Sequence, residues 1–348
     1  MDDSIPRADS FAKSTLNPEL DASAMIPARP WLSVLMPTFN GAAYVADALA
    51  SVAQECDPGI QCIVVDGGSK DDTLSIVRSF AGRLDLTVLE RPDSPNWVWS
   101  TNLALAHAAA PHSCLLHQDD LWLPGRTVAL RQLMLQAPDA ALYLHAARFI
   151  DARGRSVGNW TCPWPAAPPA ISPEQALPAL MVQCFIALPT PAFPTELARA
   201  VGGLDETLWY PCDWDFWLKL AARGRVAYCA QSLAAFRVHA SAQTVLRSRD
   251  GADFLRQLDL VVDRHLGNIQ DERLRQRVGR AARFSNRLNT ALAQKLHGRD
   301  VDWSSLALDA LRLGPCGWVR YLRDSRIYAR VAARLRAGMY RAQEPKLS

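Results

Sequence analysis

The chain has 348 residues, of which 49% are hydrophobic and 21% are charged, and its formal net charge is +3 at pH 7. A chain of this length and composition can bury a sizeable core, which excludes a globally disordered protein. The nearly neutral charge argues against a dedicated nucleic-acid binder. The basic excess is local, because residues 301–348 carry a net charge of +5 and the remainder about −2.

The eight cysteines are scattered, and no C-x-x-C pair occurs among them. This spacing argues against a disulfide framework and against a zinc knuckle. No apolar run approaches the roughly 18 residues that a membrane-spanning helix needs. The first residues, with Asp2 and Asp3, lack the basic start and apolar stretch of a secretory signal. We therefore expect a cytoplasmic protein.

After a polar arm at residues 1–29, short apolar runs alternate with segments of helical periodicity. We expect strands over 32–36, 60–65, 86–89 and 114–117. We expect helices over 42–54, 71–83, 101–109 and 124–136, and later over 213–223. Apolar strands that alternate with helices are typical of a parallel sheet covered on both faces. The Pro-rich stretch 163–173 predicts a long loop, and from about residue 250 the chain reads as helical and Arg-rich.

Polar residues follow three of the predicted strands. The three segments are Pro37-Thr38-Phe39-Asn40, residues 66–73 and His117-Gln118-Asp119-Asp120. In parallel sheets, ligands bind beyond the carboxyl ends of the strands. Each segment alone is compatible with a turn or a helix cap, but three of them at one edge predict a binding site.

In their order and spacing these segments resemble the nucleotide-sugar-binding half of the family 2 glycosyltransferases, over about residues 31–240. The resemblance implies an α/β GT-A fold with a Rossmann-like, mostly parallel sheet and helices on both faces, and a helical C-terminal region follows it here. It implies an inverting enzyme that moves a sugar from a nucleotide diphosphate donor to a hydroxyl acceptor, in bacterial surface polysaccharide or glycan synthesis. The expected partners are that donor and a glycan or lipid-linked acceptor, with no nucleic acid.

The resemblance also implies a division of the chain. A mobile arm at 1–29 precedes a GT-A domain at 30–245, which consists of a donor half (30–125) and an acceptor half (126–245). A basic, helical region at 246–348 completes the chain.

Several residues match the donor-binding positions of the family. These are Pro37, Thr38, Phe39, Asn40, Asp66, Asp93, His117, Asp119 and Arg237. By resemblance, the first four line the base and ribose pocket, Asp66 hydrogen-bonds the base, and Arg237 lies near the diphosphate. Asp71 and Asp72 close the second motif, where we expect a helix-capping role.

Asp119 matches the second acid of the family's D-x-D motif, the metal ligand, and His239 ends an Arg-x-His segment found near the diphosphate. We therefore expect Asp119 and His239 to hold Mn²⁺ or Mg²⁺. Independently of the resemblance, a leaving diphosphate needs a positive counter-charge, and a divalent cation with hard oxygen ligands supplies it. The family often has Asp where this chain has His117. Three interpretations of His117 stay open. It could ligate the metal, it could contact the ribose or diphosphate, or it could indicate an active site that depends less on a metal ion. We favour the contact.

Asp213 matches the proposed catalytic base of the family's Glu-Asp motif, and Cys212 replaces the Glu. Helical spacing places Asp213 at the head of an apolar stripe, where burial raises the pKa of a carboxyl group and makes it a better base. A plain helix-capping role stays open. Asp215 and Lys219, four residues apart, predict a solvated ion pair on the opposite face of the helix.

Arginines alternate with apolar residues near the C-terminus, as in Arg320, Arg323, Arg330 and Arg334. Such a helix either lies on an anionic membrane surface or packs on the body of the protein with its arginines solvated. We favour peripheral contact at the inner face of the membrane.

A different class of function stays open. His117 and Cys212 are also compatible with a sugar-nucleotide-binding protein that lacks transfer activity and acts as an assembly partner. The transferase hypothesis requires the carboxylates of Asp66, Asp119 and Asp213 to surround one cavity.

Overall fold

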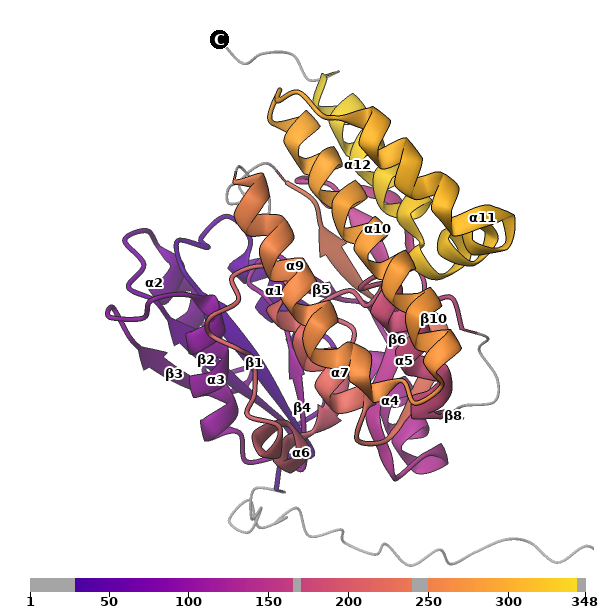
Figure 1. Ribbon diagram of the computed structural model, residues 1–348. Coiled ribbons are helices and arrows are strands. Elements are labelled where there is room, and N and C mark those ends of the chain that lie inside the picture. Colours follow the sequence, from indigo (N-terminus) through magenta and orange to yellow (C-terminus); the bar gives the residue numbers. More distant parts are fainter. Residues whose placement is uncertain (1–28, 165–169, 240–249, 343–348) are drawn as a thin grey trace, which may run out of the picture.

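The computed structural model describes residues 29–164, 170–239 and 250–342, so nearly all of the predicted arm lies outside the described residues. The strands are β1 (Leu32–Thr38), β2 (Ile60–Asp66), β3 (Asp85–Glu90), β4 (His112–Leu115), β5 (Leu121–Trp122), β6 (Ala140–Ile150), β7 (Ser156–Trp160), β8 (Ala170–Ile171), β9 (Ala192–Pro194) and β10 (Arg225–Arg237). They form one ten-stranded sheet in the order β3-β2-β1-β4-β9-β6-β10-β5, with β7 beside β6 and β8 beside β10 (Figure 1).

Helices cover this sheet and continue beyond it. They are α1 (Val45–Ala53), α2 (Thr73–Arg78), α3 (Trp97–His107), α4 (Arg126–Gln136), α5 (Pro173–Val182), α6 (Thr195–Ala200), α7 (Cys212–Ala221), α9 (Gly251–His265), α10 (Glu272–Leu296), α11 (Trp303–Ser325) and α12 (Ile327–Ala342). The predicted helices occur within a few residues of their expected bounds, and the helical C-terminal region is confirmed.

The N-terminal half of the sheet is parallel, as predicted. All seven residues of β1 are buried, because both faces of this strand are covered. β1 pairs in parallel with β2 and β4, and β2 with β3, so that Thr38 stands beside Asp66 and Asp66 beside Glu90. The chain segments that follow these strands therefore leave the sheet at a common edge.

The second half of the sheet is mixed. β6 and β10 are parallel, whereas β9 runs antiparallel to β4 and β6, β7 to β6, and β5 and β8 to β10. The α/β class is confirmed, but antiparallel pairing is more extensive than predicted. The strands that introduce most of it, β5, β8 and β9, have two or three residues each, too few to show a hydrophobic pattern.

Two large hydrophobic clusters fill the two faces of the sheet. Neighbouring residues of β1 face opposite ways. Val34 joins the cluster with α1, α2 and α4, and Leu35 joins the cluster with α3, α5 and α7. The second cluster also contains Phe254 of α9, Phe284 of α10 and Tyr321 of α11. The C-terminal helices thus share a core with the sheet, and Figure 1 shows α11 and α12 as the outermost helices on that side.

Candidate active site

Asp66, the last residue of β2, is completely buried, and hydrogen bonds occupy both of its carboxylate oxygens. Oδ1 accepts from the hydroxyl groups of Thr38 (3.1 Å) and Ser69 (2.5 Å). Oδ2 accepts from the backbone N–H groups of Gly68 (3.0 Å) and Ser69 (2.8 Å). In this arrangement Asp66 fixes the loop that follows β2.

The turn after β3 lies against this loop. Gly68 has φ +85°, a conformation that favours glycine, and a Cβ at this position would lie 2.9 Å from Cα of Pro92. Asp93, next to Pro92, is exposed in the turn between β3 and α3. Pro37 is buried within β1 one residue before Thr38. The structure therefore brings together the predicted residues at the ends of β1, β2 and β3.

Gln118 clamps the backbone of Phe39 at the same edge. The Phe39 N–H donates to Gln118 Oε1 (2.9 Å), and Gln118 Nε2 donates to the Phe39 carbonyl (3.1 Å). Gly41 leaves the room for this contact, since a Cβ there would lie 2.2 Å from Gln118 Oε1. The Phe39 side chain is 55% exposed, so its ring is free to contact a ligand. Sequence reasoning missed Gln118, because an amide that bonds backbone groups leaves no spacing signal.

Asn40 and Asp71 connect the loops after β1 and β2. The N–H of Asn40 donates to Ser69 Oγ (2.8 Å), and Asn40 Oδ1 accepts from the N–H of Lys70 (2.8 Å). Asp71 accepts from the N–H groups of Ala42 and Thr73, each at 3.1 Å, which agrees with the expected role at the start of α2. Asp72 holds the N-cap position without a side-chain cap bond.

Asp119 and His239 meet beside this edge. Asp119 Oδ2 lies 2.9 Å from His239 Nε2. Burial acts to raise the pKa of Asp119, but the hydrogen bond with His239 and the charges of His117 and His239 outweigh it and hold the pKa below its usual value. The ring of His117 lies edge-on to Trp97 of α3, with 4.7 Å between centroids, and its buried Nε2 has no hydrogen-bond partner among the described residues.

Arg237, at the end of β10, is buried and holds the segment that carries Asp119. Its Nε donates to the carbonyl of Asp119 (2.8 Å), and its N–H donates to Oδ1 of Asp120 (3.0 Å). Its Nη1 donates to the carbonyls of Asp151 and Ala152, at 3.3 and 3.2 Å. The guanidinium also stands over the ring of Tyr44, which sequence reasoning missed, with 4.5 Å to the centroid. Arg237 is therefore engaged by the protein itself and positions Asp119.

Asp213 lies in the first turn of α7. Its Oδ1 accepts from the N–H of Trp214 (2.7 Å), and burial raises the pKa of Asp213 to about 6, as the apolar stripe predicts. Trp214 is itself anchored in the core, where its Nε1 donates to the carbonyl of Leu180 (2.8 Å). Cys212, at the position of the family's Glu, is buried. The first turn of α7 thus offers one carboxylate with few hydrogen bonds.

The expected solvated pair of Asp215 and Lys219 is wrong in one respect, because Asp215 is completely buried. Lys219 does contact it (2.7 Å), but His265 of α9 also lies 2.9 Å away and Arg264 lies 3.5 Å away. Burial acts to raise the pKa of Asp215, but the hydrogen bonds with His265 and Lys219 outweigh this and lower it. Helix α9 covers the face of α7 that the pattern assigned to water.

Helix α3 contacts both the edge of the sheet and the loop that precedes α7, the helix that carries Asp213. At its start Trp97 contacts His117, and further along Asn102 binds the loop before α7. Asn102 Oδ1 accepts from the N–H of Leu204 (3.0 Å), and its Nδ2 donates to Leu204 O (2.9 Å) and Glu206 Oε1 (2.9 Å). Two cavities formed by described residues are lined by other residues, and a cavity common to Asp66, Asp119 and Asp213 stays a prediction.

The residues present fit a Mg²⁺ or Mn²⁺ ion that a substrate helps to hold. Within the described ranges, no group of three or more His, Cys, Asp and Glu side chains is placed to hold a metal alone. Asp119 and His239 supply one carboxylate and one imidazole that face each other. Mg²⁺ is usually held by one or two carboxylates together with substrate phosphates and water, and Mn²⁺ accepts similar ligands.

The sequence and structure of this chain were compared with those of known proteins. Residues 33–172 match the family described as Glycosyl transferase family 2. An uncharacterized glycosyltransferase of Rickettsia prowazekii is 25% identical over 222 residues, which span 62% of this chain and 66% of that protein.

Two solved structures share the fold. Staphylococcus aureus TarS 1–349 in complex with UDP-GlcNAc superposes with a TM-score of 0.60 at 17% identity, over 90% of this chain and 93% of that one. The mannosyltransferase PcManGT of Pyrobaculum calidifontis, in complex with GDP-Man and Mn²⁺, gives a TM-score of 0.55 at 17% identity, over 91% and 89%. Residues 33–172 therefore carry a Glycosyl transferase family 2 domain, the domain of a transferase enzyme.

Proposed function

We propose that this protein is an inverting glycosyltransferase that moves a sugar from a nucleotide diphosphate to a hydroxyl group of a glycan or lipid-linked acceptor, in bacterial surface polysaccharide or glycan synthesis. The observation that carries the proposal is Asp213, an under-bonded carboxylate whose pKa burial raises to about 6. A general base works best when its pKa lies near the working pH. The donor half is residues 30–125 and the acceptor half is residues 126–245.

The donor binds at the edge formed by the ends of β1 and β2. Phe39 offers an exposed ring for the base, and Asp66 fixes the neighbouring loop through the N–H groups of Gly68 and Ser69. TarS and PcManGT, which share this fold, have structures in complex with UDP-GlcNAc and GDP-Man. A nucleotide diphosphate sugar therefore fits this edge, and His117 contacts its ribose or diphosphate.

Asp119 and His239 would hold Mn²⁺ or Mg²⁺ beside the donor diphosphate. When bound, the cation offsets the negative charge that develops on the leaving diphosphate. The chain's own contribution is to hold these two side chains in place, which Arg237 does through the Asp119 carbonyl and the Asp120 carboxylate.

The transfer step uses Asp213 as the base. Its carboxylate takes the proton of an acceptor hydroxyl, and the hydroxyl oxygen forms a bond to the anomeric carbon. The bond between that carbon and the diphosphate oxygen breaks on the opposite face, so the anomeric configuration inverts. The electron pair of the broken bond leaves with the nucleoside diphosphate.

The test combines a donor panel with one variant. UDP-, GDP- and dTDP-sugars are each incubated with the parent protein, with and without Mn²⁺, and released nucleotide is measured. Asp213→Asn should lower turnover by about 10²–10⁴-fold, the usual contribution of a positioned base. It should leave nucleotide binding, followed by thermal shift, within twofold.

Two results would count against the proposal. Turnover of Asp213→Asn at the parent rate would remove the base from the mechanism. Nucleotide binding by the parent protein without any turnover would favour the alternative, a sugar-nucleotide-binding assembly partner, for which the unpartnered Nε2 of His117 and the buried Cys212 are the motivating observations.

Exposed side chains on both sides of the kink at Gly314 in α11 support contact with an anionic membrane surface. Five large apolar side chains of this helix are exposed by 45% or more: Trp303, Leu308, Leu311, Val319 and Leu322. Arg312 and Arg320 are exposed beside them. Exposed apolar side chains flanked by arginines are typical of a helix that lies in the headgroup region of a bilayer. In the described residues no helix is long and apolar enough to cross one.

Vesicle binding tests this surface. The double change Leu311→Asp and Val319→Asp should abolish co-sedimentation with phosphatidylglycerol vesicles, because it places charge on the face that enters the headgroups. Leu135→Asp is the matched control, since Leu135 is 82% exposed on the distant helix α4. Equal binding by the double variant and the control would remove the membrane contact from the proposal.

A further inference from the structure

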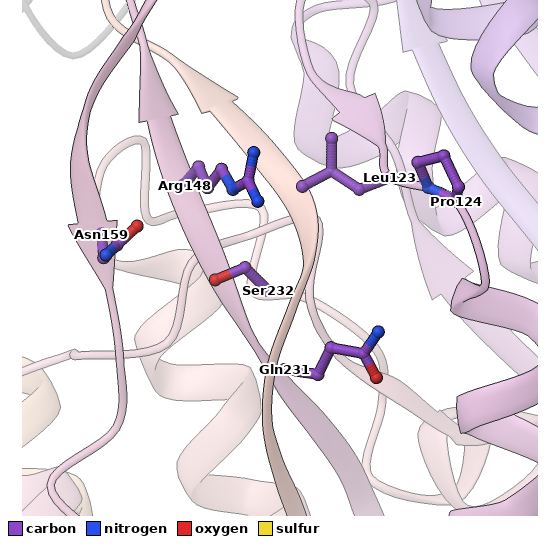
Figure 2. Close-up of a pocket in the computed structure, with 6 residues that line it drawn as sticks. All are labelled: Leu123, Pro124, Arg148, Asn159, Gln231 and Ser232. Carbon is purple, nitrogen blue, oxygen red and sulfur yellow. The ribbon is translucent and has the colours of Figure 1, made fainter.

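A cavity of about 390 Å³ opens on the second half of the sheet, and none of the residues assigned above is among its lining residues. Figure 2 shows its lining, and the guanidinium of Arg148 points across it toward Leu123. The lining residues are Leu123, Pro124, Arg148, Asn159, Gln231 and Ser232. Its volume falls within the range of small-molecule sites in proteins, roughly 300–1,000 Å³.

The polar side chains of this cavity have no partners. Among the described residues, no hydrogen bond or ion pair is formed by the side chains of Arg148, Asn159, Gln231 or Ser232. They come from three adjacent strands, β7, β6 and β10. A cluster of one guanidinium, two carboxamides and one hydroxyl therefore offers both donors and acceptors to a ligand.

The backbone is irregular at the same place. β10 pairs with β6 through Cys229 and His145, but the next pair is Ser232 with Ala146, and then Ala234 with Ala147. Extra residues of β10 therefore bulge out, and Gln231 is among them. Bulges of this kind re-aim side chains and are frequent next to functional sites.

Strand register places the cavity on the same sheet face as Arg237. Arg148 is paired with Asn159 on β7 and with Ala235 on β10, so their side chains share a face. Arg237 lies two residues beyond Ala235 and projects on that face too. Phe149 points the other way, against Trp160 and the Ala333 of α12.

The cavity is also close to Asp119 along the chain. Leu123 follows Asp119 by four residues, which span at most about 14 Å. A ligand with several sugar units is long enough to span such a distance.

We propose that this cavity is a second carbohydrate subsite, which holds a negatively charged unit of the acceptor at a distance from the unit that receives the sugar. The inference rests on the proposed transferase function. The carboxamides of Asn159 and Gln231 and the hydroxyl of Ser232 bind sugar hydroxyl groups, and Arg148 binds a carboxylate or a phosphate in bidentate fashion. Leu123 and Pro124 contact the apolar face of a sugar ring.

Binding of defined saccharides tests the subsite without any transfer reaction. The probes are a hyaluronan tetrasaccharide, which carries carboxylates, glucose 6-phosphate, which carries a phosphate, and neutral chitotetraose. We expect titration calorimetry to show at least one anionic probe binding, with Arg148→Gln weakening it at least tenfold and Gln231→Leu at least threefold. The better anionic probe identifies the charged group.

Arg225→Gln is the matched control. Arg225 is a half-exposed arginine at the other end of β10, with one long contact to Asp139 (3.5 Å), and its loss should change binding by less than twofold. The subsite is overturned if neither anionic probe binds, if chitotetraose binds as tightly as the anionic probes, or if Arg148→Gln and Arg225→Gln behave alike.

The outcome is separable from that of the proposed function. Donor turnover in the absence of acceptor should be unchanged in Arg148→Gln, since Arg148 lies outside the donor site. Saccharide binding by a parent protein that never consumes a nucleotide sugar would leave the subsite intact and reject the transferase proposal. Donor turnover without saccharide binding would support the transferase proposal and reject the subsite.

Discussion

The carboxylate at the end of β2 and the carboxylate at the head of α7 have different surroundings, since Asp66 is completely buried and Asp213 is half-buried. Asp66 accepts four hydrogen bonds, from Thr38, Gly68 and Ser69. Asp213 accepts one from Trp214, and burial raises its pKa to about 6. A buried carboxylate with many donors stabilises a loop, whereas one with few donors is ready to take a proton.

Two carboxylates on helix α7, Asp213 and Asp215, show a similar contrast although they are only two residues apart. Asp215 is as enclosed as Asp66, but its partners are cationic or ionisable side chains, Lys219 and His265. These partners lower the pKa of Asp215 below its usual value, opposite to the shift of Asp213. The surroundings of each carboxylate therefore decide its chemistry, and the following changes test that conclusion.

The largest effect on stability is expected from Asp215→Asn. Removing this charge leaves Lys219 without its counter-ion and His265 without the carboxylate that it contacts, which costs about 3–5 kcal/mol. Urea unfolding at pH 7 measures the loss. Asp213→Asn serves as the control and should lose little, because the Asp213 charge has no cationic partner among its neighbours. Equal losses in the two variants would show that the contrast on α7 is mistaken.

Asp66→Asn should destabilise the protein by about 1–3 kcal/mol. The new amide group would direct its own N–H donors at donors from Gly68 or Ser69, and a buried donor without an acceptor carries a penalty of that size. Thermal and urea unfolding detect it. Asp93→Asn, in the exposed turn, is the control and should stay within about 0.5 kcal/mol of the parent. If Asp66→Asn left the free energy of unfolding unchanged, the loop would not depend on this carboxylate.

The pH profile of transfer gives the smallest and most specific test. A carboxyl group whose pKa is raised to about 6 is protonated below that pH, and a protonated base cannot accept the acceptor's proton. We therefore expect kcat/KM to fall about tenfold per pH unit below 6 and to level off above it. Residual activity of Asp213→Asn should lack this step. A midpoint near pH 4 would instead indicate a solvated carboxylate.

The sequence by itself determined the parallel half of the fold and the residues at its edge. β1 and β2 are mainly apolar, because helices cover both faces, and a mainly apolar run can be recognised in the sequence alone. The polar residues after them, including Asp66 and Asp119, followed from the rule that parallel strands end at one edge. The raised pKa of Asp213 could also be predicted from the sequence, because the apolar stripe next to it is formed by residues of the same helix, α7.

Only the tertiary structure decided the contacts that distant segments make. Asp215 looked solvated because the pattern of α7 says nothing of α9, which covers it with His265. Arg237 gathers Asp119, Asp151 and Tyr44 from three other parts of the chain. The cavity at Arg148 depends on a bulge in β10 and on the pairing of β6 with β7 and β10. Helical and strand periodicity report only the local balance of apolar and polar faces, and the partner of each face is set by packing.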